Sequence, residues 1–409
     1  MTPPTTAHSP PGSISPRETL LDFGNQPVSN RFLQNADDTP APCFPFRLEL
    51  SPDSGLVSLA ATFPVNELKP RYGWLTNFEP EAHLDAMVLN ISRLPGVQTD
   101  AVIGAYSFKD DTTLRRMEKQ GFSRTWRIDP AQDLSVADPL ANTETWQVAF
   151  TPDSARAIAA RRGLADVFIV RHVLEHAYDF SGFVEACRAC TRPDGHIIFE
   201  VPDCARALTL GDFTSLWEEH LFYFTPATLR WMLEREGFEI IHFHSHPYPF
   251  ENSLIAFVRN TRTQGACSVD HPAVMAECDR ARNFAARFAD KKNNIRPLLE
   301  KARARHGSIA LFGAGHLSVA FLSLYGVTDL VDFVADDNPH KKGMFMPVGR
   351  LPILGSEALL EKKTGLCLLS LNPQNQPKVI EKNAAFTQAG GRFASIFPAT
   401  PLDLETVLS

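Results

Sequence analysis

The chain has 409 residues, 44% of them hydrophobic and 21% charged, which is ordinary for a globular protein of two or three domains. A net charge of −7 and a pI of about 6.0 argue against a nucleic-acid-binding surface. No run approaches the roughly 18 apolar residues of a membrane helix. Seven scattered cysteines favour reduced thiols and a cytoplasmic enzyme over a disulfide framework.

The first part of the chain is predicted to hold a tail and a small domain. Residues 1–17 lack the basic start and apolar core of a signal peptide, so we expect a disordered tail. Residues 18–72 alternate apolar and polar side chains around Ser51-Pro52-Asp53-Ser54-Gly55, which predicts a β-hairpin. This β-rich domain is expected to end near Tyr72.

Residues 73–262 are predicted to form an α/β domain. The expected strands are Asp100–Ile103, residues 123–130, Val167–Val170, His196–Val201, Glu239–His246 and Ser253–Val258. Continuous apolar strands separated by helices indicate a parallel sheet covered on both faces. The last two strands are close in sequence and are predicted to be antiparallel. A parallel sheet that ends in such a pair is the usual outline of class I methyltransferases.

Polar residues follow several of these strands, at the ends where parallel sheets bind ligands. His172, Glu175 and His176 follow the strand Val167–Val170. Asp129 ends another strand, about 20 residues after the preceding loop, where nucleotide-binding units place the acid that binds ribose. Asp110 and Asp111 begin a helix, where acids are also favoured by the helix dipole alone.

A histidine beside acids interrupts an aromatic run at Trp217-Glu218-Glu219-His220. A histidine next to a carboxylate suits proton abstraction near neutral pH, and the alternative is a hydrogen-bonded core histidine.

Other histidines and cysteines raise the question of a metal site. His242, His244 and His246 alternate along a strand and share one face, but no carboxylate or cysteine is fixed near them. Cys187 and Cys190 have no second pair. We therefore expect no bound metal.

The last part of the chain starts a second α/β unit. Residues 263–306 are predicted as linker helices, and residues 307–409 as a smaller Rossmann-like domain of four strands. Gly313-Ala314-Gly315 follows its first strand, and Asp336-Asp337 follows another. This spacing is close to a dinucleotide-binding turn, but a tight strand-to-helix turn would also require small residues.

These features together resemble the three-domain SAM-dependent C-methyltransferases that act on nucleotide-linked deoxysugars. The resemblance covers roughly residues 20–398. It rests on the ordered stretches DFGNQPVSNRFL, RHVLEH, PDGHIIFEVPD, EEHLFYF and VDFVADDNPHKKGMFMPVGRLPI. It implies a zinc-binding N-terminal domain, a class I methyltransferase core and a C-terminal Rossmann-like domain.

The resemblance also implies roles for individual residues. The catalytic set would be His220 as the base, its neighbour Glu219, a second histidine His176, and Tyr72 at the domain junction. The SAM-binding set would be Tyr106, Ser107, Asp110 and Asp111 in the glycine-loop position, Asp129 on the ribose, and His172 beside the adenosine.

The chain departs from the family pattern at several positions. Ser51 and Ser54 stand where the family has its second zinc-binding cysteine pair, and the first pair has no counterpart. Ser107 and Asp111 replace both glycines of the SAM loop, although glycine permits close backbone approach to a ligand. Leu317 takes the place of a C-terminal lysine.

The sequence therefore predicts a cytoplasmic SAM-dependent C-methyltransferase acting on a nucleotide-linked sugar or a similar polar keto metabolite. Two alternatives stay open. The chain is either a catalytically altered member that binds a nucleotide or sugar ligand, or a nicotinamide-dependent oxidoreductase that uses Gly313-Ala314-Gly315.

Overall fold

The computed structural model describes residues 15–75, 79–262 and 271–409, and they divide into two compact units. The described parts of the first unit are residues 15–18, 49–75, 79–205, 219–262 and 271–278. The second unit comprises Thr19–Leu48, Arg206–Glu218 and Asp279–Ser409. This division groups residues 19–48 with the C-terminal segment instead of placing them in a domain of residues 18–72. Most of the predicted tail lies outside the described residues.

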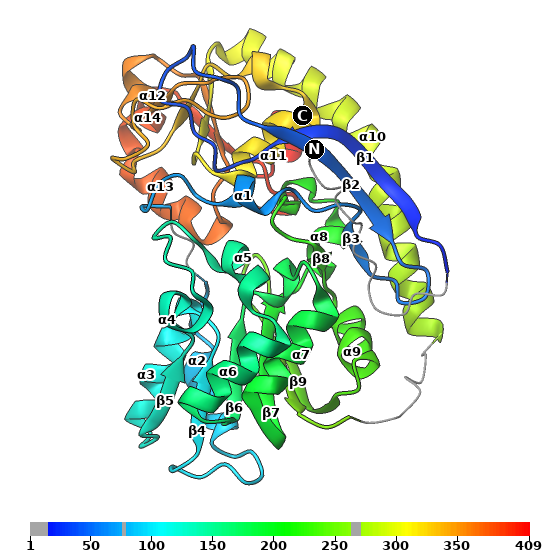
Figure 1. Cartoon of the computed structure of the whole chain (residues 1–409). Coiled ribbons are helices and arrows are strands. Elements are labelled where there is room, and N and C mark those ends of the chain that lie inside the picture. Colours follow the sequence, from blue (N-terminus) through cyan, green and yellow to red (C-terminus); the bar gives the residue numbers. More distant parts are fainter. Residues whose placement is uncertain (1–14, 76–78, 263–270) are drawn as a thin grey trace. The chain divides into compact units, whose positions relative to one another are not determined.

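A six-stranded sheet forms the centre of the first unit, with the order β5-β4-β6-β7-β10-β9 (Figure 1). Its strands are β4 (Val102–Ala105), β5 (Arg124–Arg127), β6 (Ala165–Arg171), β7 (Thr191–Pro202), β9 (Glu239–His246) and β10 (Ser253–Arg259). β4 is parallel to β5 and β6, and β6 is parallel to β7. β10 is antiparallel to both β7 and β9. The predicted parallel sheet with a final antiparallel pair is confirmed.

Helices cover both faces of this sheet. The helices of the first unit are α1 (Val65–Leu68), α2 (Leu84–Ile91), α3 (Asp111–Lys119), α4 (Pro130–Leu134), α5 (Thr143–Trp146), α6 (Pro152–Arg162), α7 (Phe180–Cys190) and α9 (Pro226–Arg235). α2 and α3 contribute buried Leu, Met, Val and Ile side chains to a core shared with β4, β6, β7 and β10. α6 and α7 lie in front of the sheet in Figure 1. Burial on both faces explains why the strands read as continuous apolar runs.

Side-chain caps set several helix starts. Thr151 accepts a hydrogen bond from the Ser154 N–H before α6, and Thr225 accepts one from the Thr228 N–H before α9. In both helices a proline occupies the first turn, where no intrahelical donor is needed. A threonine cap followed by proline is a helix start that can be read from the sequence alone.

A short strand pair belongs to the first unit. β3 (Val57–Leu59) and β8 (Phe222–Tyr223) are antiparallel, with Val57 opposite Tyr223. The chain reaches β3 through the predicted turn, where the Gly55 N–H donates to the Ser51 carbonyl at 2.8 Å. Both serines at the expected cysteine positions, Ser51 and Ser54, are buried. The Leu56 N–H donates to the Ser54 hydroxyl at 3.2 Å, so this turn is closed by hydrogen bonds.

A five-stranded parallel sheet, β13-β12-β11-β14-β15, forms the core of the second unit. Its strands are β11 (Ile309–Phe312), β12 (Phe333–Ala335), β13 (Ile353–Leu354), β14 (Leu366–Leu369) and β15 (Arg392–Ser395). Its helices are α8 (Ala205–Leu210), α10 (His271–His306), α11 (His316–Tyr325), α12 (Ala358–Glu361), α13 (Gln376–Lys382), α14 (Ala384–Gln388) and α15 (Leu404–Leu408). Four strands were predicted, and the two-residue β13 was missed. α10 and α8 begin with residues of the first unit.

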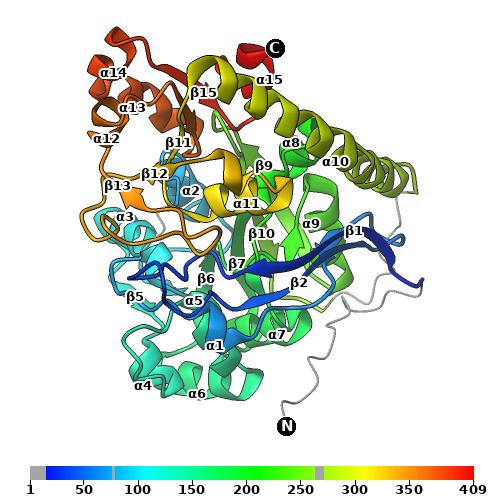
Figure 2. The same cartoon turned by 90° about the horizontal axis from the view of Figure 1, so that it is seen from above.

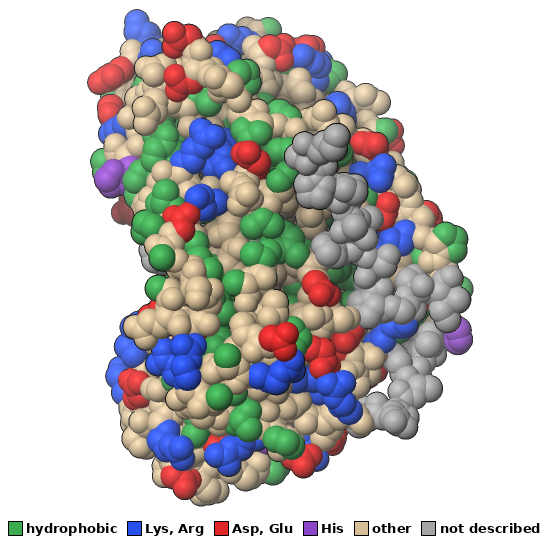
Figure 3. Space-filling view, viewed as in Figure 1, with side chains coloured by type: hydrophobic (Ala, Val, Ile, Leu, Met, Phe, Trp, Pro, Cys, Tyr) green, Lys and Arg blue, Asp and Glu red, His purple; other side chains and the backbone are tan. Residues whose placement is uncertain are grey.

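Two long strands also belong largely to the second unit. β1 (Glu18–Pro27) and β2 (Cys43–Leu50) are neighbours in their sheet, and Figure 2 shows them side by side. On the face shown in Figure 3, basic and acidic side chains are interspersed. Among the described residues, no helix is both long and apolar enough to span a membrane.

Candidate functional site

The loop after β4 is a tight turn closed by side chains. Ser107 caps the short 3-10 helix Phe108–Asp110, and its N–H donates to Asp110 Oδ2 at 2.8 Å. The Lys109 N–H donates to the Ser107 hydroxyl at 3.2 Å. Ser107 has φ −139°, an extended conformation that does not need glycine. The side chains of Ser107 and Asp110 thus form this turn without either of the family glycines.

Asp110 is the buried acid of this loop. Its side chain is 0% exposed, and Oδ1 has no hydrogen-bond partner among the described residues. Burial raises the pKa of Asp110 to about 7, against the opposing effect of the Arg171 charge. A buried carboxylate oxygen without a partner is costly, and the SAM-binding role of Asp110 stays a prediction.

Tyr106, the first residue after β4, lies inside an aromatic cluster. Its side chain is fully buried and stacks on Trp146, with ring centroids 5.0 Å apart. The rings of Phe150 and Phe183 pack against its edge. An aromatic cluster thus surrounds the Tyr106 side chain, and the SAM-binding role of this loop position stays a prediction. Its N–H donates to the Ile169 carbonyl at 2.9 Å, which fixes the loop on β6.

Asp111 and Asp129 lie at the ends of neighbouring elements. Asp111 begins α3 and pairs with Arg127, with Oδ2 and Nη1 3.3 Å apart. Asp129 caps α4, and its Oδ1 accepts from the Ala131 and Gln132 N–H groups at 2.9 and 3.0 Å. Both bonds use Oδ1 of a half-exposed side chain. The cofactor role predicted for Asp129 stays a prediction.

His172 belongs to a buried network of charges. It follows β6 with a positive φ of 51°, and its Nε2 is 3.0 Å from Glu200 Oε1. Its Nδ1 is 3.5 Å from Glu79 Oε2 and 3.6 Å from Glu175 Oε1. Burial alone would lower the pKa of His172, but the Glu79 and Glu200 charges raise it to about 10. His172 is therefore a histidinium held between carboxylates, and its predicted role beside the adenosine stays a prediction.

Two further cations complete this network. The Arg171 guanidinium is 0% exposed and donates from Nε to Glu200 Oε2 at 2.5 Å. The Lys109 ammonium lies 3.0 Å from Glu79 Oε1 and donates to the His172 carbonyl at 2.7 Å. Burial would raise the pKa of Glu79, but His172 and Lys109 lower it to about 2. These charges link the carboxyl ends of β4, β6 and β7.

The network predicts how stability changes with pH. The folded-state pKa of His172 is above the usual value of 6.5, so its contribution is full below pH 6.5 and is lost as pH rises towards 10. In urea titrations between pH 8.5 and 10, the unfolding free energy should fall by up to about 1.4 kcal/mol per pH unit. The variant His172→Asn should show a flatter profile in this window. Equal slopes for both proteins would contradict the charged state of His172.

A second group of polar side chains follows the same strand. η3 (Leu174–His176) is a 3-10 helix that contains Glu175 and His176, both buried. The Glu175 carbonyl accepts the Leu221 N–H at 2.8 Å, and the Leu59 N–H donates to the Leu221 carbonyl at 3.0 Å. These backbone bonds place His220 beside η3. The rings of His176 and His220 are 4.8 Å apart and nearly perpendicular.

The predicted catalytic residues are partly brought together. His176 Nδ1 is 2.7 Å from the Glu219 carbonyl oxygen, so Nδ1 donates and Glu219 orients the ring through its backbone. Potential ligand atoms of Glu175, His176 and His220 all lie within 4.8 Å of one another. Tyr72 stacks on Trp74 at 5.0 Å, and its catalytic role stays a prediction.

Sequence reasoning missed most of the buried charges. Neither Glu79 nor Lys109 lies in a motif that predicted a buried ion pair. Glu200 could have indicated these charges, because it is a lone acid in the apolar run HIIFEVP of β7. An acid in a strand buried on both faces requires a cationic partner.

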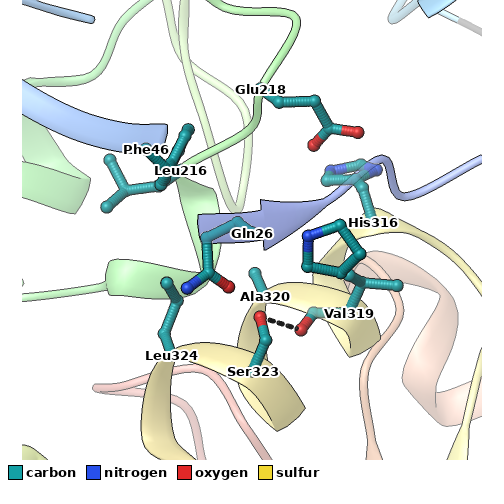
Figure 4. A pocket seen from close by; sticks show the side chains of 10 residues that line it. Gln26, Phe46, Leu216, Glu218, His316, Val319, Ala320, Ser323 and Leu324 are labelled. Carbon is teal, nitrogen blue, oxygen red and sulfur yellow. Dashed lines mark hydrogen bonds between the residues drawn. The ribbon is translucent and has the colours of Figure 1, made fainter. Parts of the chain in front are cut away.

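The second unit also contains predicted positions. Figure 4 shows a pocket of about 20 Å³ that Gln26, Glu218, His316 and Ser323 help to line. This volume suits about one water molecule. His316 stacks on Trp217 at 4.6 Å, and burial lowers the pKa of His316 to about 4.

The glycine turn of the second unit is closed by its own groups. The Ala314 N–H donates to Asp336 Oδ2 at 2.8 Å. Lys341 Nζ donates to the same carboxylate at 3.1 Å and to the Ala314 carbonyl at 2.6 Å. Asp336 thus closes the turn between β11 and α11 through hydrogen bonds. This favours a tight strand-to-helix turn at Gly313-Ala314-Gly315 over a dinucleotide-binding site.

Comparisons with known proteins agree with this architecture. A family model described as "Methyltransferase domain" matches residues 106–243, and one described as "C-methyltransferase C-terminal domain" matches residues 259–398. The chain is 25% identical over 399 residues to C-methyltransferase NovU of Streptomyces niveus, with 93% of this chain and 92% of that protein covered.

Solved methyltransferase structures are also similar. The 1,6-didemethyltoxoflavin-N1-methyltransferase of Burkholderia thailandensis is 17% identical with a TM-score of 0.30, covering 44% of this chain and 79% of that one. A SAM-dependent methyltransferase of Aquifex aeolicus is 9% identical with a TM-score of 0.29, covering 48% and 97%. A methyltransferase domain at residues 106–243 is followed by a C-terminal domain of C-methyltransferases at residues 259–398. In this order of domains the chain is similar to SAM-dependent C-methyltransferases, the resemblance that the sequence motifs predicted.

Proposed function

We propose that this protein transfers a methyl group from SAM to a carbon next to the carbonyl of a polar keto metabolite, with a nucleotide-linked sugar as the substrate class. One observation carries the proposal within this family. The rings of His176 and His220 meet beside a buried carboxylate, Glu175, at the carboxyl end of β6. That is the edge of the sheet where α/β enzymes place their chemistry.

The geometry suits removal of a proton from carbon. A carbon next to a ketone becomes nucleophilic only when it loses a proton, and imidazole can accept protons near neutral pH. His220 is partly exposed and can meet a substrate, whereas His176 is buried and oriented by the Glu219 carbonyl. SAM supplies the methyl group when it is bound. His220 is accordingly assigned as the base and His176 as the residue that positions it.

Asp129 and Asp110 are the residues proposed to hold SAM. Asp129 offers Oδ2 to a ribose hydroxyl, and Asp110 presents a buried, unpartnered Oδ1 at the end of β4. Replacing Asp129 by Ala removes a charged hydrogen bond worth about 1.5–3 kcal/mol. We expect the dissociation constant for SAM to rise by roughly 10- to 100-fold. Calorimetry with SAM and with S-adenosylhomocysteine measures this change.

Asp138→Ala is a matched control for that measurement. Asp138 is an exposed acid of the same unit that pairs with Lys69 at 2.6 Å. Its loss should leave SAM affinity unchanged. A wild-type protein that binds no SAM at millimolar concentration would contradict the proposal.

The substrate class can be tested without methyl transfer. The protein is incubated in D₂O with nucleotide-linked keto sugars and S-adenosylhomocysteine, and deuterium in the recovered sugar is measured by mass spectrometry. Exchange at the carbon next to the carbonyl, lost in His220→Asn, would support the proposed base and substrate class together. SAM binding without exchange of any keto sugar would reject the substrate class while retaining the methyltransferase.

A second candidate function is a catalytically altered member that binds its ligand without methylation. It is favoured by the loop at residues 106–111, which has no glycine, and by the Lys109 and Arg171 side chains buried at the strand ends. The two candidates differ in one result. The altered protein would bind a nucleotide sugar in calorimetry but would bind neither SAM nor S-adenosylhomocysteine.

A further inference from the structure

We propose that Glu175, His176 and His220 form a binding site for Zn²⁺ or a similar divalent transition-metal ion, and that an ion bound there stops proton abstraction by His220. Each residue offers one ligand atom, and these atoms lie within 4.8 Å of one another. Two imidazoles and one carboxylate are ligands that Zn²⁺ accepts, with a fourth position left for water. The three residues are not predictable as a metal site from their spacing, because His220 is 44 residues from His176 in the chain.

The three side chains would have to move only a short distance to bind an ion. Zn²⁺ binds imidazole nitrogen and carboxylate oxygen at about 2.0–2.2 Å, which places tetrahedral ligands roughly 3.4 Å apart. Glu175 Oε1 is already 3.8 Å from His176 Nε2. His220 is the partly exposed member, so its side chain can adjust while the buried pair keeps its position.

The backbone prepares His176 to be a ligand. A carbonyl oxygen only accepts hydrogen bonds, so the 2.7 Å contact with the Glu219 carbonyl puts a proton on His176 Nδ1. In the neutral ring the lone pair is then on Nε2, the atom nearest Glu175. Metal-binding histidines characteristically donate their other ring nitrogen to a carbonyl or carboxylate in this way.

Glu175 gives the second, independent observation. Its side chain is 1% exposed, and Oε2 has no hydrogen-bond partner among the described residues. A buried carboxylate oxygen without a donor is costly, and a cation would satisfy it. The backbone carbonyl of Glu175 holds the Leu221 N–H at 2.8 Å, which fixes η3 against the segment that contains His220.

The effect on activity rests on the proposed function, but binding does not. A nitrogen that is coordinated to Zn²⁺ cannot accept a proton, so a His220 ligand is no longer a base. Metal-free protein would be the active form, and micromolar Zn²⁺ would inhibit it reversibly.

Metal binding is tested on the full chain after dialysis against EDTA. Calorimetry with ZnCl₂ and visible absorption with CoCl₂ report binding without SAM or substrate. We expect one equivalent per chain and a loss of affinity of at least 10-fold in each of Glu175→Gln and His220→Asn. The matched control is His242→Ala with His244→Ala, which removes the histidines that alternate on β9 and should leave binding unchanged.

Several outcomes would overturn the proposal. These are no binding to the wild type, unchanged affinity in Glu175→Gln, and loss of binding only in the β9 control. Circular dichroism and melting temperatures show whether each variant is folded, and Glu175→Asp provides a second carboxylate variant if Glu175→Gln unfolds. Zn²⁺ binding without inhibition would disprove only the proposed inhibition of proton abstraction. Absence of methyl transfer would leave the binding result intact.

Discussion

Replacement of His220 by Asn is expected to lower the rate of methyl transfer by roughly 10²- to 10⁴-fold, the usual contribution of a general base. Asparagine keeps a polar side chain of similar size but cannot accept the substrate proton. SAM binding should be retained, because the proposed cofactor residues Asp110 and Asp129 lie at the ends of β4 and β5. Single-turnover rates with saturating SAM, together with calorimetry, separate the two effects.

The matched control for this variant is His242→Asn on the edge strand β9, where the histidine is exposed. It should have the wild-type rate. His176→Asn should have an intermediate effect and change the pH profile of the rate, because His176 acts through His220. A His220→Asn enzyme that retains more than a fifth of the wild-type rate would show that another group removes the proton.

The sequence was a good guide to the sheets because burial on both faces imposes a simple pattern. The run Val167–Val170 and the strand Ser253–Val258 have no alternation, and both occupy interior positions of the six-stranded sheet. The strand Glu239–His246 was also placed correctly, because Gly237 ends the preceding helix and the antiparallel partner follows closely. β13 has two residues, too few for any periodic signal.

The site was less predictable because its contacts join distant parts of the chain. Glu79, His172 and Glu200 meet in space although each looks local in sequence. Their pairing depends on the β6–β7 register, which sets Arg171 opposite Glu200. The aromatic cluster around Tyr106 was not predictable for a related reason, since the aromatic rings that enclose it come from other elements. The His176–His220 pair became a prediction only through the family resemblance.

The largest effect on stability is expected at Arg171. Its guanidinium is fully buried and donates to the Glu200 carboxylate at 2.5 Å, to the Lys109 carbonyl at 2.6 Å and to the Pro80 carbonyl at 3.1 Å. Arg171→Met removes these donors and leaves Glu200 buried with less compensation. Breaking a buried pair in this way costs about 3–5 kcal/mol. Urea unfolding followed by tryptophan fluorescence should show this loss in the midpoint and free energy.

The control is an ion pair of the same kind on the surface. Arg156 pairs with Asp153 on α6, and their side chains are 63% and 91% exposed. Arg156→Met should change the unfolding free energy by less than about 1 kcal/mol, because exposed pairs contribute little. A comparable effect in the two variants would mean that burial does not amplify the Arg171 interaction.

The double variant Arg171→Met with Glu200→Met separates the two origins of this loss. If the cost of Arg171→Met comes mainly from a carboxylate left without its guanidinium, replacing Glu200 as well should recover part of the stability. Recovery should be incomplete, because Glu200 also lies 3.0 Å from both His172 Nε2 and His83 Nε2, and these groups would lose their acceptor. If the double variant loses more unfolding free energy than the two single variants lose together, the two Met side chains cannot pack at these positions. The comparison therefore shows whether the Arg171–Glu200 pair adds to the stability of the fold or only offsets the cost of burying its two charges.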